Sequence, residues 1–142
     1  FPNNGPGLYI HETKNALIVV MNTFNNVVEE VQIDDIPLNK WINVVLRCKG
    51  RDMDTYVNGT IVNRHRFNAV PKQNYGDVYI NMNNGFGGLI SSLRYFSYAL
   101  TGVEINNLVN AGPNLTADDS MRIFPPYLSL RWFFSTENPK KT

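Results

Sequence analysis

The chain has 142 residues, and its 13 Lys and Arg against 12 Asp and Glu give a net charge of +1. That balance argues against a nucleic-acid binder, because neutralising phosphates needs a basic surface. Hydrophobic residues make up 43% of the chain and aromatic residues 12%, as in a folded globular domain. No apolar run approaches the roughly 18 residues of a membrane span. Cys48 is the only cysteine, which rules out an internal disulfide and a Cys-based zinc site.

Short runs rich in Val, Ile, Tyr and Phe, separated by Asn, Gly, Pro and Asp, predict β-strands along most of the chain. The runs are Leu8–His11, Ala16–Met21, Val27–Ile33, Trp41–Cys48, Met53–Val57, Thr60–Arg66, Asp77–Met82, Leu89–Ser97 and Leu128–Phe134. Several alternate between apolar and polar residues, which indicates one buried and one mostly wet face of an antiparallel sheet. Many such strands at close spacing predict an all-β sandwich or barrel.

The dipeptide Asn58-Gly59 between two alternating runs predicts a hairpin with a type I′ turn, since both central residues of that turn need positive φ. With a second tight turn at Lys49-Gly50, three consecutive strands form a meander. Asn58-Gly59-Thr60 is also an N-glycosylation acceptor, as is Asn114-Leu115-Thr116, if the protein enters a secretory route. Both readings of Asn58 remain open at this point.

One helix is predicted after the strands. Thr101 and Glu104 have capping-box spacing, and apolar residues then follow at helical intervals, up to a stop at Gly112. We expect this helix to plug one end of the sandwich. We also expect residues 1–134 to form a single domain and residues 135–142 a polar C-terminal tail.

Two stretches carry a family resemblance. "LNKWINVVLRCKGRDMDTYVNGTIV" resembles the middle of laminin-G-like, concanavalin A-like lectin/glucanase domains, with their W-x-x-V strand and x-Y-V-N-G hairpin. "GFGGLISSLRYFSYALTGVEINNLVNAGPN" is similar to their closing block of a strand, a helix start and a glycine stop. The resemblance covers about residues 15–114. It implies an antiparallel jelly roll of two sheets whose N-terminal strands are missing here, which leaves a sheet edge unpaired.

The stretches "VPKQNYGDVYINMNNGFGG" and "PPYLSLRWFF" resemble versions of this domain in virion proteins of large double-stranded DNA viruses. This resemblance implies a capsid- or virion-associated protein, assembled in the host cytoplasm, whose partners are other proteins of the particle. An extracellular or cell-surface location is the alternative. The absence of disulfides agrees with cytoplasmic assembly.

Glycoside hydrolysis is the enzymatic alternative, because some members of the resembled family are glucanases. Their catalytic strand carries E-x-D-x-x-E, which brings two carboxyls to about 5 Å. This sequence lacks that motif. Glu29 and Glu30 fall on opposite faces of a strand, and Asp52 and Asp54 share a face beside a turn, where solvated charges are expected. We therefore expect no catalytic residue and no enzymatic activity.

A ligand face is predicted in two places. Asp77, Asn81 and Asn83 offer the oxygen ligands of a calcium or sugar site, although a polar strand before an Asn-Gly turn would look the same. Arg64 and Arg66 share one strand face and could meet anionic glycans, or form a solvated outer face. No cofactor is expected unless calcium is bound.

Two functions follow from these observations. The first is a non-enzymatic module that docks neighbouring proteins, in keeping with the virion resemblance and the unpaired edge. The second is a glycan-binding lectin module for host attachment, which rests on analogy with the resembled family.

Overall fold

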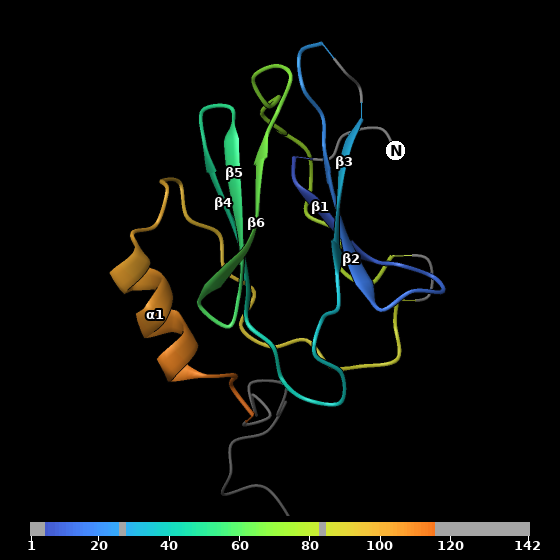
Figure 1. Ribbon diagram of the computed structural model, residues 1–142, viewed down its shortest axis with the longest axis vertical. Coiled ribbons are helices and arrows are strands. Elements are labelled where there is room, and N and C mark those ends of the chain that lie inside the picture. The colour runs from blue at the N-terminus through green and yellow to red at the C-terminus, as the bar shows by residue number, and fades with distance from the viewer. Residues whose placement is uncertain (1–4, 26–27, 83–84, 116–142) are drawn as a thin grey trace, which may run out of the picture.

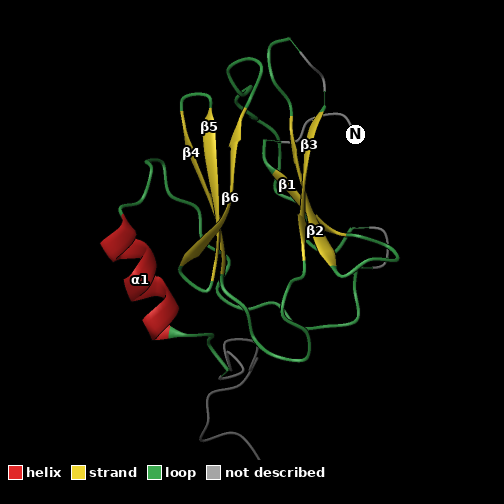
Figure 2. Cartoon of the chain, in the orientation of Figure 1, coloured by secondary structure: helices red, strands yellow, loops and turns green. Residues whose placement is uncertain are grey.

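The computed structural model of the protein describes residues 5–25, 28–82 and 85–115. Two antiparallel sheets of three strands face each other, and one helix lies against the outer side of the second sheet (Figures 1 and 2). The predicted all-β sandwich with one short helix is confirmed.

The first sheet has the order β1-β2-β3 and contains β1 (Gly7–Ile10), β2 (Ala16–Met21) and β3 (Glu29–Asp34). Its two antiparallel pairings put Val19 opposite Leu8 on one side and Val31 on the other. Burial alternates along β3, where Glu29 is buried and Glu30 exposed, so the predicted opposite placement of these two carboxylates is confirmed.

The second sheet is the predicted meander of β4 (Val44–Lys49), β5 (Asp52–Val57) and β6 (Thr60–Arg66). Asn58 and Gly59 adopt φ of +50° and +80°, as a type I′ turn requires. The Asn58 side-chain oxygen also accepts a hydrogen bond of 2.9 Å from the Asn43 backbone N–H, which ties the turn to the start of β4. Val62 has no partner on β5 and forms a bulge in β6.

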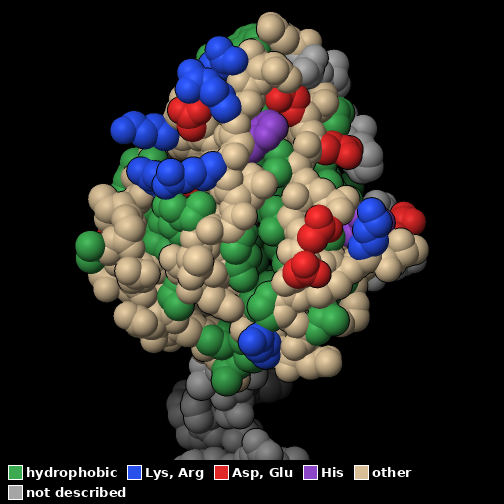
Figure 3. Space-filling view, viewed as in Figure 1, with side chains coloured by type: hydrophobic (Ala, Val, Ile, Leu, Met, Phe, Trp, Pro, Cys, Tyr) green, Lys and Arg blue, Asp and Glu red, His purple; other side chains and the backbone are tan. Residues whose placement is uncertain are grey.

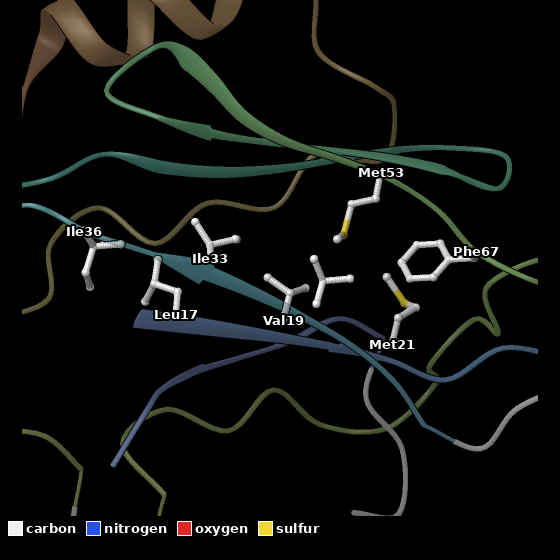
Figure 4. Close-up of a cluster of buried hydrophobic side chains, with 8 residues drawn as sticks. Leu17, Val19, Met21, Ile33, Ile36, Met53 and Phe67 are labelled. Carbon is white, nitrogen blue, oxygen red and sulfur yellow. The ribbon is translucent and has the colours of Figure 1, made fainter. Parts of the chain in front are cut away.

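Apolar side chains from both sheets fill the space between them (Figure 4). Met21 of β2 lies beside Met53 of β5 and Phe67, which follows β6. Leu17 lies near Ile33 and Ile36, at the other end of the cluster. Met53 is fully buried and Phe67 is 1% exposed, so each contributes the full burial of a large side chain, about 1.5–3 kcal/mol.

Helix α1 (Gly102–Ala111) begins as predicted, because Thr101 and Glu104 form a reciprocal capping box. The Glu104 backbone N–H donates to Thr101 Oγ1 over 3.3 Å, and the Thr101 N–H donates to Glu104 Oε2 over 2.7 Å. The predicted position of the helix was wrong. Ile105 packs with Tyr56 and Leu100 on the outer face of the second sheet, because the apolar stripe of the helix matches the apolar part of that face. Helix α1 therefore covers one face of a sheet and does not close an end of the sandwich.

Two predicted strands were also wrong. The structure assigns no strand to Asp77–Met82 or Leu89–Ser97, although both alternate in sequence. Every described residue from Lys72 to Ile90 is exposed, so neither face of the first segment is buried against a neighbour. Alternation makes a strand only where a partner accepts the hydrogen bonds and one face is covered. The predicted strand Leu128–Phe134 and the tail lie outside the described residues.

Candidate functional site

Charged side chains from the three strands of the second sheet meet on its outer face. The register sets Arg47 opposite Asp54 and Asp54 opposite Arg64. Arg47 Nη1 lies 3.0 Å from Asp54 Oδ2, and Arg64 Nε lies 3.2 Å from Asp54 Oδ1. One carboxylate on the central strand therefore holds two guanidinium groups side by side.

A second row extends this arrangement toward the end of the sheet. Lys49 and Arg66 both pair in register with Asp52, and Arg66 Nη1 lies 3.3 Å from Asp52 Oδ1. We call the six residues the charged ladder: Arg47, Lys49, Asp52, Asp54, Arg64 and Arg66. Its four cations and two carboxylates give a net charge of +2. Figure 3 shows Lys and Arg side chains gathered over the ends of these strands.

The cations of the charged ladder differ in accessibility. The Arg47 side chain is 27% exposed, whereas the Arg64 and Arg66 side chains are 72% and 69% exposed. The predicted shared face of Arg64 and Arg66 is confirmed, and His65 lies on the opposite face of β6. Arg51, from the turn before β5, instead donates to the carbonyls of Phe67 and Asn68 and holds the backbone after β6.

The buried carboxylate of Glu29 joins the two sheets. Its Oε1 accepts from Thr23 Oγ1 over 2.9 Å, and both of its oxygens accept from the Asn68 backbone N–H. His65 Nε2 of β6 lies 3.7 Å from Glu29 Oε2. Burial alone raises the pKa of Glu29, but the hydrogen bonds from Asn68 and Thr23 and the nearby His65 outweigh it and hold the pKa below its ordinary value of 4.5. This cluster is structural, because Glu29 faces the interior.

The predicted calcium or sugar ligands lie on an exposed segment. Asp77 and Asn81 are both exposed, and Asn81 has φ of +56°. Asn83 lies outside the described residues. Within residues 5–25, 28–82 and 85–115, no group of three or more His, Cys, Asp or Glu side chains could hold a metal ion. Asp77 and Asn81 offer one carboxylate between them, which is little charge for a calcium site. Calcium binding there stays a prediction.

The two glycosylation acceptors are both exposed at the asparagine. Asn58 uses its side-chain oxygen in the turn, and the Asn114 backbone N–H donates to Ser91 Oγ over 2.8 Å. Glycosylation at either site stays a prediction. In the part of the protein that the structure describes, no helix is long and apolar enough to cross a membrane.

Large apolar side chains crowd the segment that was predicted to form two strands. Among described residues 77–82 and 85–97, eight are at least 50% exposed: Val78, Tyr79, Ile80, Met82, Leu89, Ile90, Leu93 and Tyr95. We call them the Val78–Tyr95 surface. Sequence alternation found these residues but placed them in the sandwich.

A pocket of about 420 Å³ lies beside the β2–β3 turn and is lined by Phe24, Pro71, Lys72, Gln73 and Tyr75. Sequence reasoning missed it, because its two walls come from segments almost 50 residues apart in the sequence. The available signal was two aromatic residues among turn-forming residues, outside every predicted strand.

One protein family and one solved structure are similar to this chain. No match is found among curated proteins. A crystal structure of an S-layer domain-containing protein (residues 221–444) from Clostridium thermocellum ATCC 27405 aligns with 16% identity and a TM-score of 0.42, covering 77% of this chain and 64% of that one. The family model of the concanavalin A-like lectin/glucanases superfamily matches residues 2–106, which include all six strands of the two sheets and the start of α1. The chain belongs to the concanavalin A-like lectin/glucanases superfamily.

Proposed function

We propose that this domain is a non-enzymatic module that docks a neighbouring protein through the Val78–Tyr95 surface. The observation that carries the proposal is the exposure of these eight large apolar side chains in one stretch of sequence. We infer that so many large apolar side chains along one segment are covered by a partner, because leaving them in water is costly.

The partner that fits this surface is an extended protein segment. Among the described residues, neither Asp77–Met82 nor Leu89–Ser97 forms a strand ladder, and the Met82 carbonyl accepts from the Gly85 N–H. We infer that the other backbone groups of these two segments can pair with an added strand. Alternating apolar side chains on both segments would then be covered by the partner. In keeping with the sequence resemblance, we expect that partner among the proteins of a viral particle.

The arrangement of acidic residues also favours binding over catalysis. The Glu29 carboxylate is 7% exposed and held inside the sandwich, while Glu30 points to the other face. Asp52 and Asp54 each contact at least one arginine of the charged ladder. None of these pairs resembles two carboxyls facing a cleft across a glycosidic bond.

A photo-cross-linking amino acid at Tyr79 tests the docking proposal in the native host. The matched control is Val103 on α1, because both side chains are 70% exposed. We expect Tyr79 to cross-link to a defined peptide of one other protein, with no such product from Val103. Cross-links from Tyr79 only to residues of this same protein, or equal products from both sites, would contradict the proposal.

Glycan binding is a second candidate, favoured by the two exposed arginines of the charged ladder. Side by side on the surface, Arg64 and Arg66 could each contact a sulfate or carboxylate of an anionic polysaccharide. We expect retention on a sulfated polysaccharide column at low salt, weakened in Arg64→Gln/Arg66→Gln and unchanged in Lys40→Gln. Repeating the assay with calcium and with EDTA tests whether calcium bound at Asp77 and Asn81 contributes to retention. If the wild-type protein is not retained on the column at low salt, the glycan-binding proposal is wrong.

A further inference from the structure

The backbone around the Phe24–Tyr75 pocket is fixed to the sandwich. Thr23 forms an antiparallel bridge with Pro71, the Phe24 N–H donates to the Val70 carbonyl over 3.1 Å, and the Lys72 N–H donates to the Asn22 carbonyl over 2.8 Å. Thr23 in turn donates to the buried Glu29 carboxylate. These bonds hold the backbone of residues 22–24 and 70–72, the two walls of the pocket, at a fixed distance. A ligand would therefore meet a backbone that needs no rearrangement.

The side chains of the pocket are not used by the core. Phe24 is 69% exposed and Tyr75 is 87% exposed, and neither belongs to a buried cluster. Lys72 Nζ lies 5.8 Å from the centre of the Phe24 ring, within cation–π range. The Tyr75 hydroxyl donates to Gln73 Oε1 over 3.1 Å, which leaves the Gln73 amide N–H groups for a ligand.

The lining indicates the chemistry of the ligand. A volume of about 420 Å³ falls within the range of about 300–1,000 Å³ that ligand pockets span. Among the described residues that line it, Lys72 is the only charged one, so a negative ligand is favoured. Two aromatic rings and a proline suit a flat or branched apolar group. The polar side-chain groups of the described lining are the Lys72 ammonium, the Gln73 amide and the Tyr75 hydroxyl, fewer than the hydroxyls of one sugar.

We propose that this pocket binds a peptide through an apolar side chain that lies next to a carboxylate. The apolar group would sit between Phe24 and Tyr75, and the carboxylate would accept from Lys72 Nζ and the Gln73 amide. The carboxylate is either the free carboxyl terminus of the peptide or an Asp or Glu side chain. The pocket shares no residue with the Val78–Tyr95 surface, so it is a second contact site that can fail or hold independently of the docking proposal.

Chemical-shift titration of the full-length 142-residue protein tests the proposal with four probes. They are N-acetyl-Leu-Phe with a free carboxyl terminus, its C-terminal amide, N-acetyl-Phe-Glu amide, and glucuronic acid. We expect saturable millimolar binding of the first or third probe, with shifts at Gln73 and Tyr75. The neutral amide should bind about three- to fivefold more weakly, the loss expected for one exposed ion pair. Which carboxylate probe binds more tightly identifies the source of the carboxylate.

Variants separate the pocket from the rest of the surface. Lys72→Gln should abolish the preference for the carboxylate probe over its amide, and Tyr75→Ala should weaken both. Tyr95→Ala is the matched control, because Tyr95 and Tyr75 are both 87% exposed, and it should change neither. The proposal is overturned if no peptide probe saturates, if neither carboxylate probe binds more tightly than the neutral amide, if Tyr95→Ala has the effect of Tyr75→Ala, or if glucuronic acid binds most tightly.

Discussion

Strand β5 and the segment Asp77–Met82 are six residues each, begin with aspartate and alternate apolar side chains, yet only β5 is a strand. Met53, Thr55 and Val57 of β5 are buried between the sheets. The corresponding Val78 is 80% exposed. Alternation therefore supplies a face that can be buried, and a neighbouring strand decides whether it is.

The two regions differ in where their neighbours come from. Tight turns at Lys49-Gly50 and Asn58-Gly59 bring β4 and β6 to the two edges of β5 from within a few residues. Within the described residues, no strand pairs with Asp77–Met82. Local partners cost little loop-closure entropy, whereas a distant or foreign partner must be recruited.

The comparison is most strongly tested by one methionine from each region. Met53→Ala should lower the free energy of unfolding by about 2–5 kcal/mol, because it leaves a cavity between the sheets. Met82→Ala should change it by less than about 0.5 kcal/mol, since Met82 is 55% exposed. Urea unfolding measures both. Similar losses in the two variants would mean that Asp77–Met82 is as well packed as β5.

The turn after β5 tests how much a tight turn contributes to the pairing of neighbouring strands. Gly59→Val should cost about 2–4 kcal/mol, because a side chain is strained at φ +80° and its Cβ would lie 3.1 Å from Asn106 Oδ1 of α1. Gly50→Val is the control, since φ there is +63° but a Cβ meets nothing within 4 Å. The difference between their unfolding midpoints reports how firmly α1 packs on the turn. Equal costs would leave α1 without a role in holding the turn.

Glu29 tests the tie between the two sheets. Glu29→Gln should cost about 1–3 kcal/mol, since the bonds from Thr23 and Asn68 lose a charged acceptor. Because the folded pKa of Glu29 lies below its ordinary value of 4.5, its contribution is complete above that pH and is lost as the pH falls through the folded pKa. Stability of the wild type should therefore decline below pH 4.5, and Glu29→Gln should decline less. Glu30→Gln, on the opposite face, should keep the wild-type slope; if it flattens the slope as Glu29→Gln does, the assignment is wrong.

The helix cap gives the smallest expected effect. Thr101→Ala removes the hydroxyl that accepts from the Glu104 N–H and should cost about 1 kcal/mol. Circular dichroism during thermal unfolding will measure it. A loss no larger than that of an exposed substitution such as Val103→Ala would show that the capping box adds nothing to α1.

Features set by short-range chemistry could be predicted from the sequence. The Asn58-Gly59 turn, the meander and the capping box each depend on residues a few positions apart. The position of α1 could not be predicted, because it depends on packing against Tyr56, which lies about 50 residues earlier in the chain. The candidate sites also divide into a local part that could be predicted and a non-local part that could not. The shared face of Arg64 and Arg66 follows from strand alternation, but the Glu29–Asn68 contact joins residues 39 positions apart. The Phe24–Tyr75 pocket is equally non-local.

Amide hydrogen exchange tests the central claim most directly. We predict slow exchange for β4–β6 and fast exchange for residues 77–82 and 89–97 in the purified protein. In complex with the partner protein that cross-links to Tyr79, exchange in those two segments should become slow while β4–β6 stays unchanged. Slow exchange of residues 77–82 and 89–97 already in the purified protein would show that their partner lies within this same molecule, and would contradict the docking account.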